Sequence, residues 1–178
     1  GGLSIFDEET NTFTNFEHDI RNPASLSSNM VMCLFEDTTG NIWVGTENGL
    51  NRFDKNEGSF QSYTSDASDP ESLSNNIVWV LLEDSKKNLW IGTAGAGLNR
   101  WSQNDRDSNI ARFTRYSEHL NLPSSAIYGI QEDSQGMLWV SHNKGITRIN
   151  TITGDSRQYG VQDGLQATEF NLGASFKS

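Results

Sequence analysis

The pentapeptide Ile42-Trp43-Val44-Gly45-Thr46 returns twice along the chain, as Leu89-Trp90-Ile91-Gly92-Thr93 and as Leu138-Trp139-Val140-Ser141-His142. Its tryptophans stand 47 and 49 residues apart. Self-similarity at a fixed period of this size is typical of repeat architectures, in which each repeat is one supersecondary unit. The sequence therefore predicts a structural unit that recurs about every 48 residues.

Three other columns keep the same period around each tryptophan. A Glu-Asp pair precedes the indole, with the Asp six residues before it, a Gly-Leu or Gly-Ile pair follows, and an aromatic residue closes most units. These columns occupy Glu36-Asp37, Glu83-Asp84 and Glu132-Asp133; Gly2-Leu3, Gly49-Leu50, Gly97-Leu98 and Gly145-Ile146; and Phe16, Tyr63, Tyr116 and Tyr159. So many coincident columns indicate one fold element copied along the chain.

Each unit contains four short segments suited to strands. Mostly apolar runs at 30–36, 77–83 and 126–132 fit strands that are covered on both faces. A tight turn containing Asp leads into the Trp strand, and the Gly-Leu pair opens a third strand. A more polar fourth strand follows, for example at 60–64. No stretch shows sustained helical periodicity.

Four-stranded units of this length predict an all-β fold, a β-propeller of four-stranded antiparallel blades. Because one blade cannot cover both of its own faces, each repeat tryptophan is expected to pack against the neighbouring blade. A β-sandwich is the alternative all-β fold, but it requires no fixed period. We therefore expect a propeller with about three full blades and two partial ones.

The blade boundaries follow from the columns. We expect a single partial propeller over 1–178, with the end of a blade at 1–20, full blades at 26–64, 73–117 and 122–160, and the start of a next blade at 165–178, including an innermost strand over 170–176. Rings of this class usually hold about 4 to 8 blades. A fragment of a larger ring is favoured over closure in which the two ends combine within one molecule or between two.

Composition excludes several classes of protein. The 178 residues include 13 Lys and Arg against 23 Asp and Glu, a net charge of −10. An acidic chain is a poor nucleic-acid binder, because that affinity comes from neutralising phosphates. No apolar run approaches the roughly 20 residues of a membrane-spanning helix. The single cysteine, Cys33, permits no internal disulfide, and the chain opens with no targeting segment.

Several motifs suggest chemistry but are better explained as structure. The glycine-rich stretch 92–97 leads into a strand rather than the helix that a phosphate-binding loop requires. The Glu-Asp pairs recur once per blade at a turn, whereas catalytic carboxylates converge at one site. The three histidines share no metal-ligand spacing, and the acidic loop 65–72 lacks the regular ligand alternation of a calcium site. We expect no catalytic residue, no metal and no cofactor.

One face of the ring is the candidate ligand site. In a propeller, the loops before each innermost strand and the turns between second and third strands lie on the same side. These segments vary between units while the strands do not, as expected for a scaffold that presents different loop chemistry. The candidate ligand-binding residues are Asn76, Trp79, Tyr128, His142 and Asn143. Amides and aromatic rings suit a sugar. The alternative, that Trp79 and Tyr128 simply fill the inner core, is favoured for these two residues.

The segments 73–84, 88–93 and 97–100 together resemble the two-component regulator propeller repeat. They read Leu-Ser-Asn-Asn-Ile-Val-Trp-Val-Leu-Leu-Glu-Asp, Asn-Leu-Trp-Ile-Gly-Thr and Gly-Leu-Asn-Arg. The resemblance extends over nearly the whole chain, and the segment from Asp163 to Ser178 is similar to the final stretch of such propellers. The third unit departs from the pattern, with Ser141-His142 in place of Gly-Thr and Pro123-Ser124 in place of Ser-Asn.

Membership of that family implies a periplasmic sensor region of a bacterial signalling receptor. The output domain is usually a histidine kinase, often hybrid, and sometimes a diguanylate cyclase. The resemblance also implies a homodimer formed through the parent receptor and a membrane helix, both outside this sequence. The ligand class that it implies is often an oligosaccharide.

The sequence is compatible with three functions. The first is a non-catalytic module that binds a carbohydrate or another small ligand and passes a signal. The second is a dimerisation scaffold without a small ligand, and the third is a polysaccharide lyase or hydrolase on a propeller. The first is favoured, because no converging carboxylates are apparent.

Overall fold

The computed structural model describes residues 1–116, 122 and 125–175 and contains three four-stranded antiparallel sheets and one two-stranded sheet. The first full sheet is formed by β3 (Val31–Glu36), β4 (Ile42–Thr46), β5 (Gly49–Asp54) and β6 (Ser59–Tyr63). The second holds β7 (Val78–Glu83), β8 (Leu89–Thr93), β9 (Leu98–Trp101) and β10 (Phe113–Arg115). The third holds β11 (Ile127–Glu132), β12 (Leu138–His142), β13 (Gly145–Ile149) and β14 (Ser156–Tyr159). The two-stranded sheet is the hairpin of β1 (Leu3–Asp7) and β2 (Thr12–Phe16).

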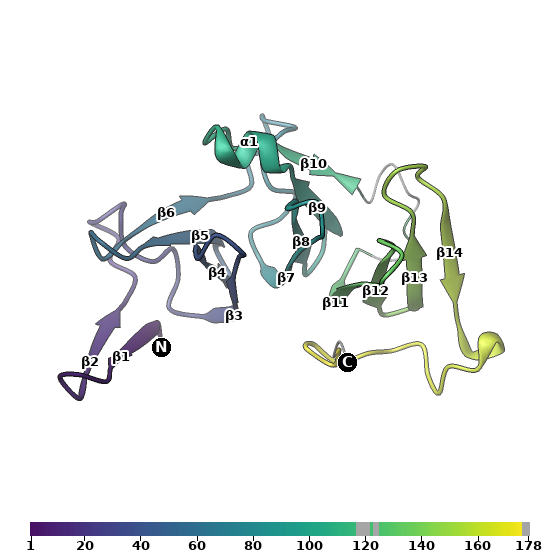
Figure 1. Cartoon of the computed structure of the whole chain (residues 1–178), viewed down its shortest axis with the longest axis horizontal. Helices are drawn as coiled ribbons and strands as arrows, with labels where there is room; N and C mark the ends of the chain where they lie inside the picture. Colours follow the sequence, from purple (N-terminus) through teal and green to yellow (C-terminus); the bar gives the residue numbers. More distant parts are fainter. Residues whose placement is uncertain (117–121, 123–124, 176–178) are drawn as a thin grey trace.

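The three full sheets, called blades 1 to 3 below, form an arc. The innermost strands β3, β7 and β11 follow one another along its concave side, and the fourth strands lie outside (Figure 1). In every blade the strand order follows the chain, as in a propeller. The expectation of an all-β propeller with about three full blades is confirmed.

The core lies between blades, where the repeat tryptophans pack. Trp43 is 1% exposed and packs in one cluster with Leu81, Leu89 and Trp101 of blade 2. Trp90, also 1% exposed, packs in a second cluster that holds Ile130 and other apolar residues of blade 3. The predicted packing of each indole against the next blade is therefore observed at both complete junctions.

The aspartate of each Glu-Asp pair fixes the indole. One carboxylate oxygen of Asp37 accepts a hydrogen bond from Trp43 Nε1 at 2.8 Å, and Asp84 and Asp133 bond Trp90 and Trp139 at the same distance. The other oxygen accepts backbone amides of the following turn, such as Asn41 N at 3.0 Å. The six-residue spacing seen in the sequence therefore has a geometric cause: one side chain closes the turn and also satisfies the buried indole N–H.

Two further contacts join neighbouring blades, one at each end of the innermost strands. At one end, Glu83 accepts Thr38 N at 2.9 Å, and Glu132 accepts Ser85 N at 2.8 Å. At the other end, the amides of Gly2, Gly49 and Gly97 donate to the loop before the next innermost strand, and the amide of Gly145 donates to the loop after β14. These bonds are Gly2 N to Asn29 O at 2.8 Å, Gly49 N to Asn76 O at 2.6 Å, Gly97 N to Ser125 O at 2.7 Å and Gly145 N to Thr168 O at 2.8 Å.

Blade 3 has Ser141 where blades 1 and 2 have a glycine, and a glycine on the neighbouring strand compensates for this change. Gly92 pairs with Val80, and a Cβ on Gly92 would lie 2.6 Å from Val80 Cγ1. In blade 3 the residues are exchanged, because Ser141 pairs with Gly129. A Cβ on Gly129 would lie 2.9 Å from Ser141 Oγ. Each blade thus places one glycine in this pair, and only the strand that carries it changes.

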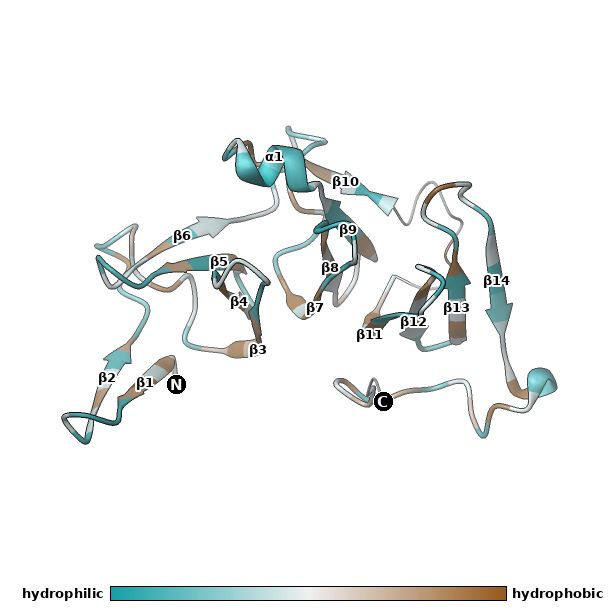
Figure 2. Cartoon of the chain, viewed as in Figure 1, coloured by the Kyte–Doolittle hydropathy of each residue, from teal (hydrophilic) through white to brown (hydrophobic). Residues whose placement is uncertain are grey.

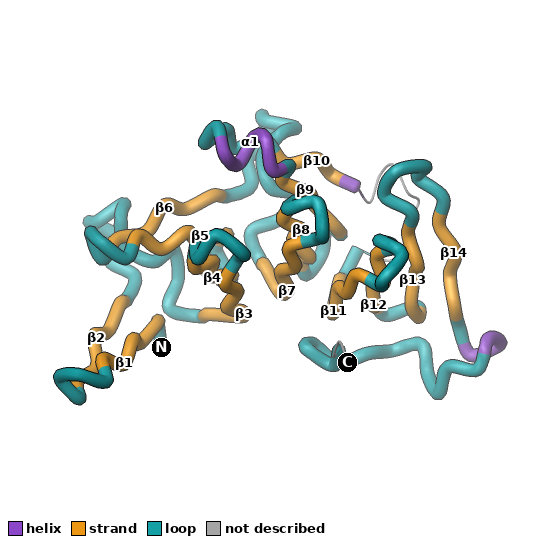
Figure 3. Tube along the Cα trace, in the orientation of Figure 1, coloured by secondary structure: helices purple, strands orange, loops and turns teal. Residues whose placement is uncertain are grey.

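Two details differ from the sequence-based expectations. A five-residue helix, α1 (Gln103–Asp107), lies between β9 and β10 and is capped by the Ser102 side chain. It is too short to leave a periodic signal. The innermost strand expected over 170–176 is not formed in its described part, since the chain after β14 is a 3₁₀ turn, η1 (Val161–Asp163), followed by loop (Figure 3). An innermost strand needs a Trp strand beside it for its ladder, and 165–175 have none.

Candidate functional site

The inner side of the arc carries one aromatic pair. Each innermost strand has a register irregularity at its start, between Val31 and Cys33, Val78 and Val80, and Ile127 and Gly129. The extra residues there are Met32, Trp79 and Tyr128, because a bulge leaves one residue out of the ladder and re-aims its side chain. The rings of Trp79 and Tyr128 stack with centroids 5.3 Å apart and planes at 18°, and both are partly exposed.

This stack crosses a blade junction. Trp79 belongs to β7 of blade 2 and Tyr128 to β11 of blade 3. Each inner strand begins with hydrophobic residues and ends in a glutamate (Figure 2). The stack adds aromatic surface near the start of two of these strands. A ligand packed against the exposed edges of both rings would contact two blades at once.

Asn76 lies before β7 and holds loops together. Its side-chain oxygen accepts Ser65 N at 2.6 Å, its amide nitrogen lies 3.5 Å from Asn48 Oδ1, and its carbonyl accepts Gly49 N. These bonds agree with a sequence-based expectation. The turn between the second and third strands of blade 1 lies on the same side as the loop before the innermost strand of blade 2. Asn76 therefore stabilises that side of the ring through both its side chain and its backbone.

His142 is placed differently from the expected ligand contact. It is 0% exposed, with Nε2 at 2.8 Å from Thr147 Oγ1 and Nδ1 accepting Lys144 N at 3.1 Å. Both ring nitrogens are occupied within the β12–β13 hairpin, so the side chain offers no free atom to a ligand in this conformation. It replaces Thr46 and Thr93, which use their hydroxyls on the same turn. The neighbouring Asn143 is exposed at the tip of that turn.

His142 should make stability depend on pH. Burial, with a smaller effect of Lys144, lowers its pKa from 6.5 to about 4. The unfolded chain therefore binds this proton more readily, and the free energy of unfolding falls as the pH drops from 6.5 towards 4, by about 3 kcal/mol in all. We expect His142→Thr, which restores the residue of the other repeats, to remove this dependence. Urea unfolding of both proteins at pH 7, 6 and 5 measures it; parallel curves would contradict the assignment.

Of the five candidates, the structure brings Trp79 and Tyr128 into contact. Asn76 precedes the strand that carries Trp79, and His142 pairs with Ile127, the residue before Tyr128. Asn143 adjoins His142 at the end of the same hairpin. Met32, at the corresponding place in blade 1, was not singled out from the sequence. Met32 aligns with Trp79 and Tyr128 and lies one residue before Cys33, the ladder partner of Gly45. That alignment identifies Met32 only once the bulge is known.

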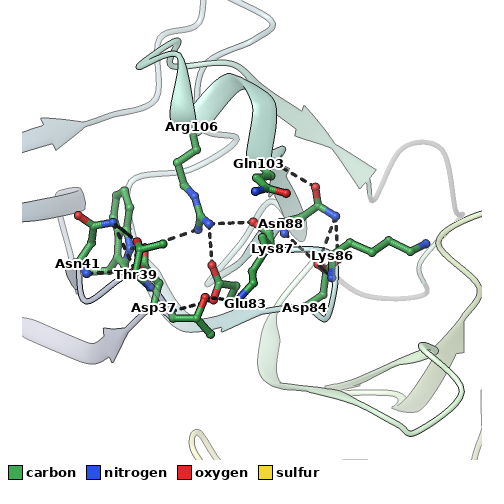
Figure 4. A network of polar contacts seen from close by, with 12 residues as sticks. Asp37, Thr39, Asn41, Glu83, Asp84, Lys86, Lys87, Asn88, Gln103 and Arg106 are labelled. Carbon is green, nitrogen blue, oxygen red and sulfur yellow. Dashed lines mark hydrogen bonds and ion pairs between the residues drawn. The ribbon is translucent and has the colours of Figure 1, made fainter.

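A polar network on the opposite end of the blades was not predicted (Figure 4). Arg106 of α1 reaches between blades 1 and 2 with its side chain 8% exposed. Its Nη2 donates to Glu83 Oε1 at 2.6 Å and to Lys87 O at 2.8 Å, and its Nη1 lies 3.9 Å from Asp37 Oδ2. Burial favours the neutral acid at Glu83, but hydrogen bonds from Thr38 and Arg106 outweigh it and lower its pKa. The network ties the junction of blades 1 and 2 electrostatically.

Among residues 1–116, 122 and 125–175, no cluster of three or more His, Cys, Asp or Glu side chains is arranged to hold a metal ion. Within the same part of the chain, no helix has the length and hydrophobicity to cross a bilayer.

Comparison with known families gives the blades their identity. The family described as "Two component regulator propeller" matches residues 25–48, 72–95 and 121–144, the inner half of each full blade. Three blades of this chain are two component regulator propeller repeats. Each matched segment runs from the loop before the innermost strand to the turn after the Trp strand, and so includes the Asp–indole bond and the bulge.

Solved structures share the regulator propeller fold. One is the extracellular domain of a protein described as a hybrid two component system of B. thetaiotaomicron, with a TM-score of 0.71 and 24% identity over 88% of this chain. A second such domain from the same organism gives a TM-score of 0.65 and 22% identity over 88% of the chain. This chain spans 20% and 19% of their lengths. At these identities the likeness establishes the fold alone.

An enzyme also carries this propeller architecture. Virginiamycin B lyase from Staphylococcus aureus matches with a TM-score of 0.59 and 21% identity, over 88% of this chain and 47% of the lyase. Among curated proteins, no sequence matches this chain.

Proposed function

We propose that these regulator propeller repeats form a non-catalytic, ligand-sensing part of an extracytoplasmic bacterial receptor. The Trp79–Tyr128 stack is the observation that supports this most directly. A pair of stacked, partly exposed rings on the inner side of a propeller offers aromatic surface to the apolar face of a sugar ring or another flat ligand. Extracellular domains of hybrid two component systems share this fold and support an extracytoplasmic location in a receptor.

The ligand class that fits best is a neutral oligosaccharide. The net charge of −10 repels polyanions, so acidic glycans are disfavoured. Asn143 and the loops around Asn76 offer amides near the rim of the inner surface, which suit hydroxyl groups.

A ligand on the stack would act at the junction of blades 2 and 3. Signalling requires that a ligand bind one arrangement of the blades better than another. Because the two rings come from different blades, a sugar that contacts both favours the arrangement in which they stay stacked. The junction of blades 1 and 2, which Arg106 ties on the other end, would change less.

A panel of neutral and acidic oligosaccharides tests the proposal by thermal shift and calorimetry. At 100 times its dissociation constant, a ligand should add about 2.7 kcal/mol to the free energy of unfolding. We expect Trp79→Ala and Tyr128→Ala to weaken binding by about tenfold or more. Phe13→Ala, a change at a 66% exposed aromatic away from the inner strands, is the control and should bind normally.

Three outcomes would contradict this function. No shift with any saccharide would remove carbohydrate sensing, and equal binding by all three variants would place the ligand elsewhere. Cleavage of a saccharide by the same protein, followed as new reducing or unsaturated ends, would favour the enzyme.

A further inference from the structure

An apolar groove lies between the β1–β2 hairpin and blade 1. Its volume is about 950 Å³, and its apolar lining comes from Leu3, Ile5, Phe16, Leu34, Ile42 and Phe53. Leu34 is 57% exposed and Ile5 is 39% exposed. Large apolar side chains exposed together mark a surface that another chain segment covers.

The same surface occurs twice more in this chain, and there it is covered. Leu34 pairs with Val44 as Leu81 pairs with Ile91 and Ile130 with Val140. Leu81 and Ile130 are only 8% and 2% exposed, because each lies in the cluster that receives the tryptophan of the preceding blade. The groove beside Leu34 therefore corresponds to an indole site, and no indole among the described residues occupies it.

The hairpin that forms the other wall has an open edge. β5 and β13 each pair with a strand on both sides, whereas in the described part of the chain β1 pairs with β2 alone. β1 is also bonded to blade 1 as a third strand is, through Gly2 N to Asn29 O. Its free edge is thus the one that a Trp strand borders in the full blades, and such an edge accepts a further strand.

Glu36 supplies a third matching feature at the end of the groove. Its counterparts Glu83 and Glu132 each accept a backbone amide from the turn of the preceding blade. The Glu36 side chain is instead 61% exposed, and Lys55 lies 3.8 Å from it. The hydrogen-bond acceptor for a neighbouring turn is therefore present and accessible.

We propose that this groove binds a strand–turn–strand hairpin of the same repeat, a half-blade that completes the sheet begun by β1 and β2. Its second strand adds to the free edge of β1 and places a tryptophan against Leu34, Ile42 and Phe53. Its turn donates a backbone amide to Glu36. The surface is continuous with the junctions already described, since it uses the columns that join blade 1 to blade 2 and blade 2 to blade 3.

A synthetic peptide tests this directly. Residues 76–93 of this chain contain both strands and the turn of such a hairpin. Added to the intact 178-residue protein, the fluorescently labelled peptide should bind in a one-to-one complex and slow hydrogen exchange at the amides of residues 3–7. The same peptide carrying Trp90→Ala should bind about tenfold more weakly or worse.

Matched protein variants place the peptide in the groove. Leu34→Asp changes an exposed side chain, so the fold should survive while peptide affinity falls about tenfold or more. Ile20→Asp alters a residue that is 89% exposed and does not line the groove, and should bind the peptide normally. Absence of binding, unprotected β1 amides, or equal affinity for both variants would overturn the proposal. A dimer that dissociates in Leu34→Asp would also overturn it, because a second copy would then be the occupant.

Discussion

Replacing Trp90 with alanine should lower the free energy of unfolding by about 3–5 kcal/mol. The indole is 1% exposed, fills the junction of blades 2 and 3, and contacts Tyr116 edge-on with ring centroids 4.9 Å apart. Its removal leaves a cavity between two sheets that each depend on the other for burial. It also takes away the N–H that Asp84 accepts at 2.8 Å, so a buried carboxylate loses a hydrogen bond.

The chain contains its own control for this experiment. Trp139 occupies the same column, bonds Asp133 identically and stacks on Tyr159. It is only partly buried, because the described residues after β14 form a turn and a loop rather than a sheet. Trp139→Ala should therefore cost less, about 1–2 kcal/mol. Trp90→Phe keeps most of the bulk and should fall between the two. Urea unfolding followed by circular dichroism measures all three, and a loss at Trp139 as large as at Trp90 would refute burial between blades as the source of stability.

Replacing Arg106 with leucine should cost about 3–5 kcal/mol, because Glu83 and Asp37 would stay buried without their cation. The side chains of Arg106, Glu83 and Asp37 are 8%, 2% and 0% exposed. Adding Glu83→Gln to the Leu variant should recover part of the loss, since the buried charge is then gone. Arg112→Leu is the matched control: this arginine pairs with Glu71 and Asp105 but is 49% exposed, so the cost should stay below about 1 kcal/mol.

The Arg106 effect should also depend on pH in a defined direction. Because the pKa of Glu83 is lowered in the folded protein, the stability it contributes is present above its unfolded value of 4.5 and is lost as the pH falls below it. The difference between the native protein and Arg106→Leu should therefore be largest near neutrality and shrink below pH 4.5. A difference that stays constant down to pH 3, or equal losses for Arg106→Leu and Arg112→Leu, would show that the network is not electrostatic.

The repeat columns predicted the features that all blades share, but few of the features that belong to one blade alone. The Trp column predicted the blade junctions, and the Asp six residues earlier was expected to close a turn, although its bond to the indole was not foreseen. Trp79 and Tyr128 were named as candidates from residue type, but their stacking depends on bulges that have no signal in a single sequence. His142 was assigned to a loop, and only the hairpin geometry shows that its ring is enclosed.

Arg106 shows why the remainder could not be predicted. It lies in an insertion that has no counterpart in the other blades, so no column suggested a role for it. Its partners are distant in sequence, with Asp37 in another blade. Long-range ion pairs depend on tertiary placement, which neither composition nor periodicity encodes.

The exchange of glycine between Val80–Gly92 and Gly129–Ser141 limits how such a gene can be shuffled. A recombination crossover in the turn between the first and second strands would join the first strand of one blade to the second strand of another, for example β11 of blade 3 to β8 of blade 2. One product would set Gly129 against Gly92 and leave a void, and the reciprocal product would force Val80 against Ser141. Crossovers between whole blades keep both residues of each pair together, so duplication by complete units is the route that preserves folding.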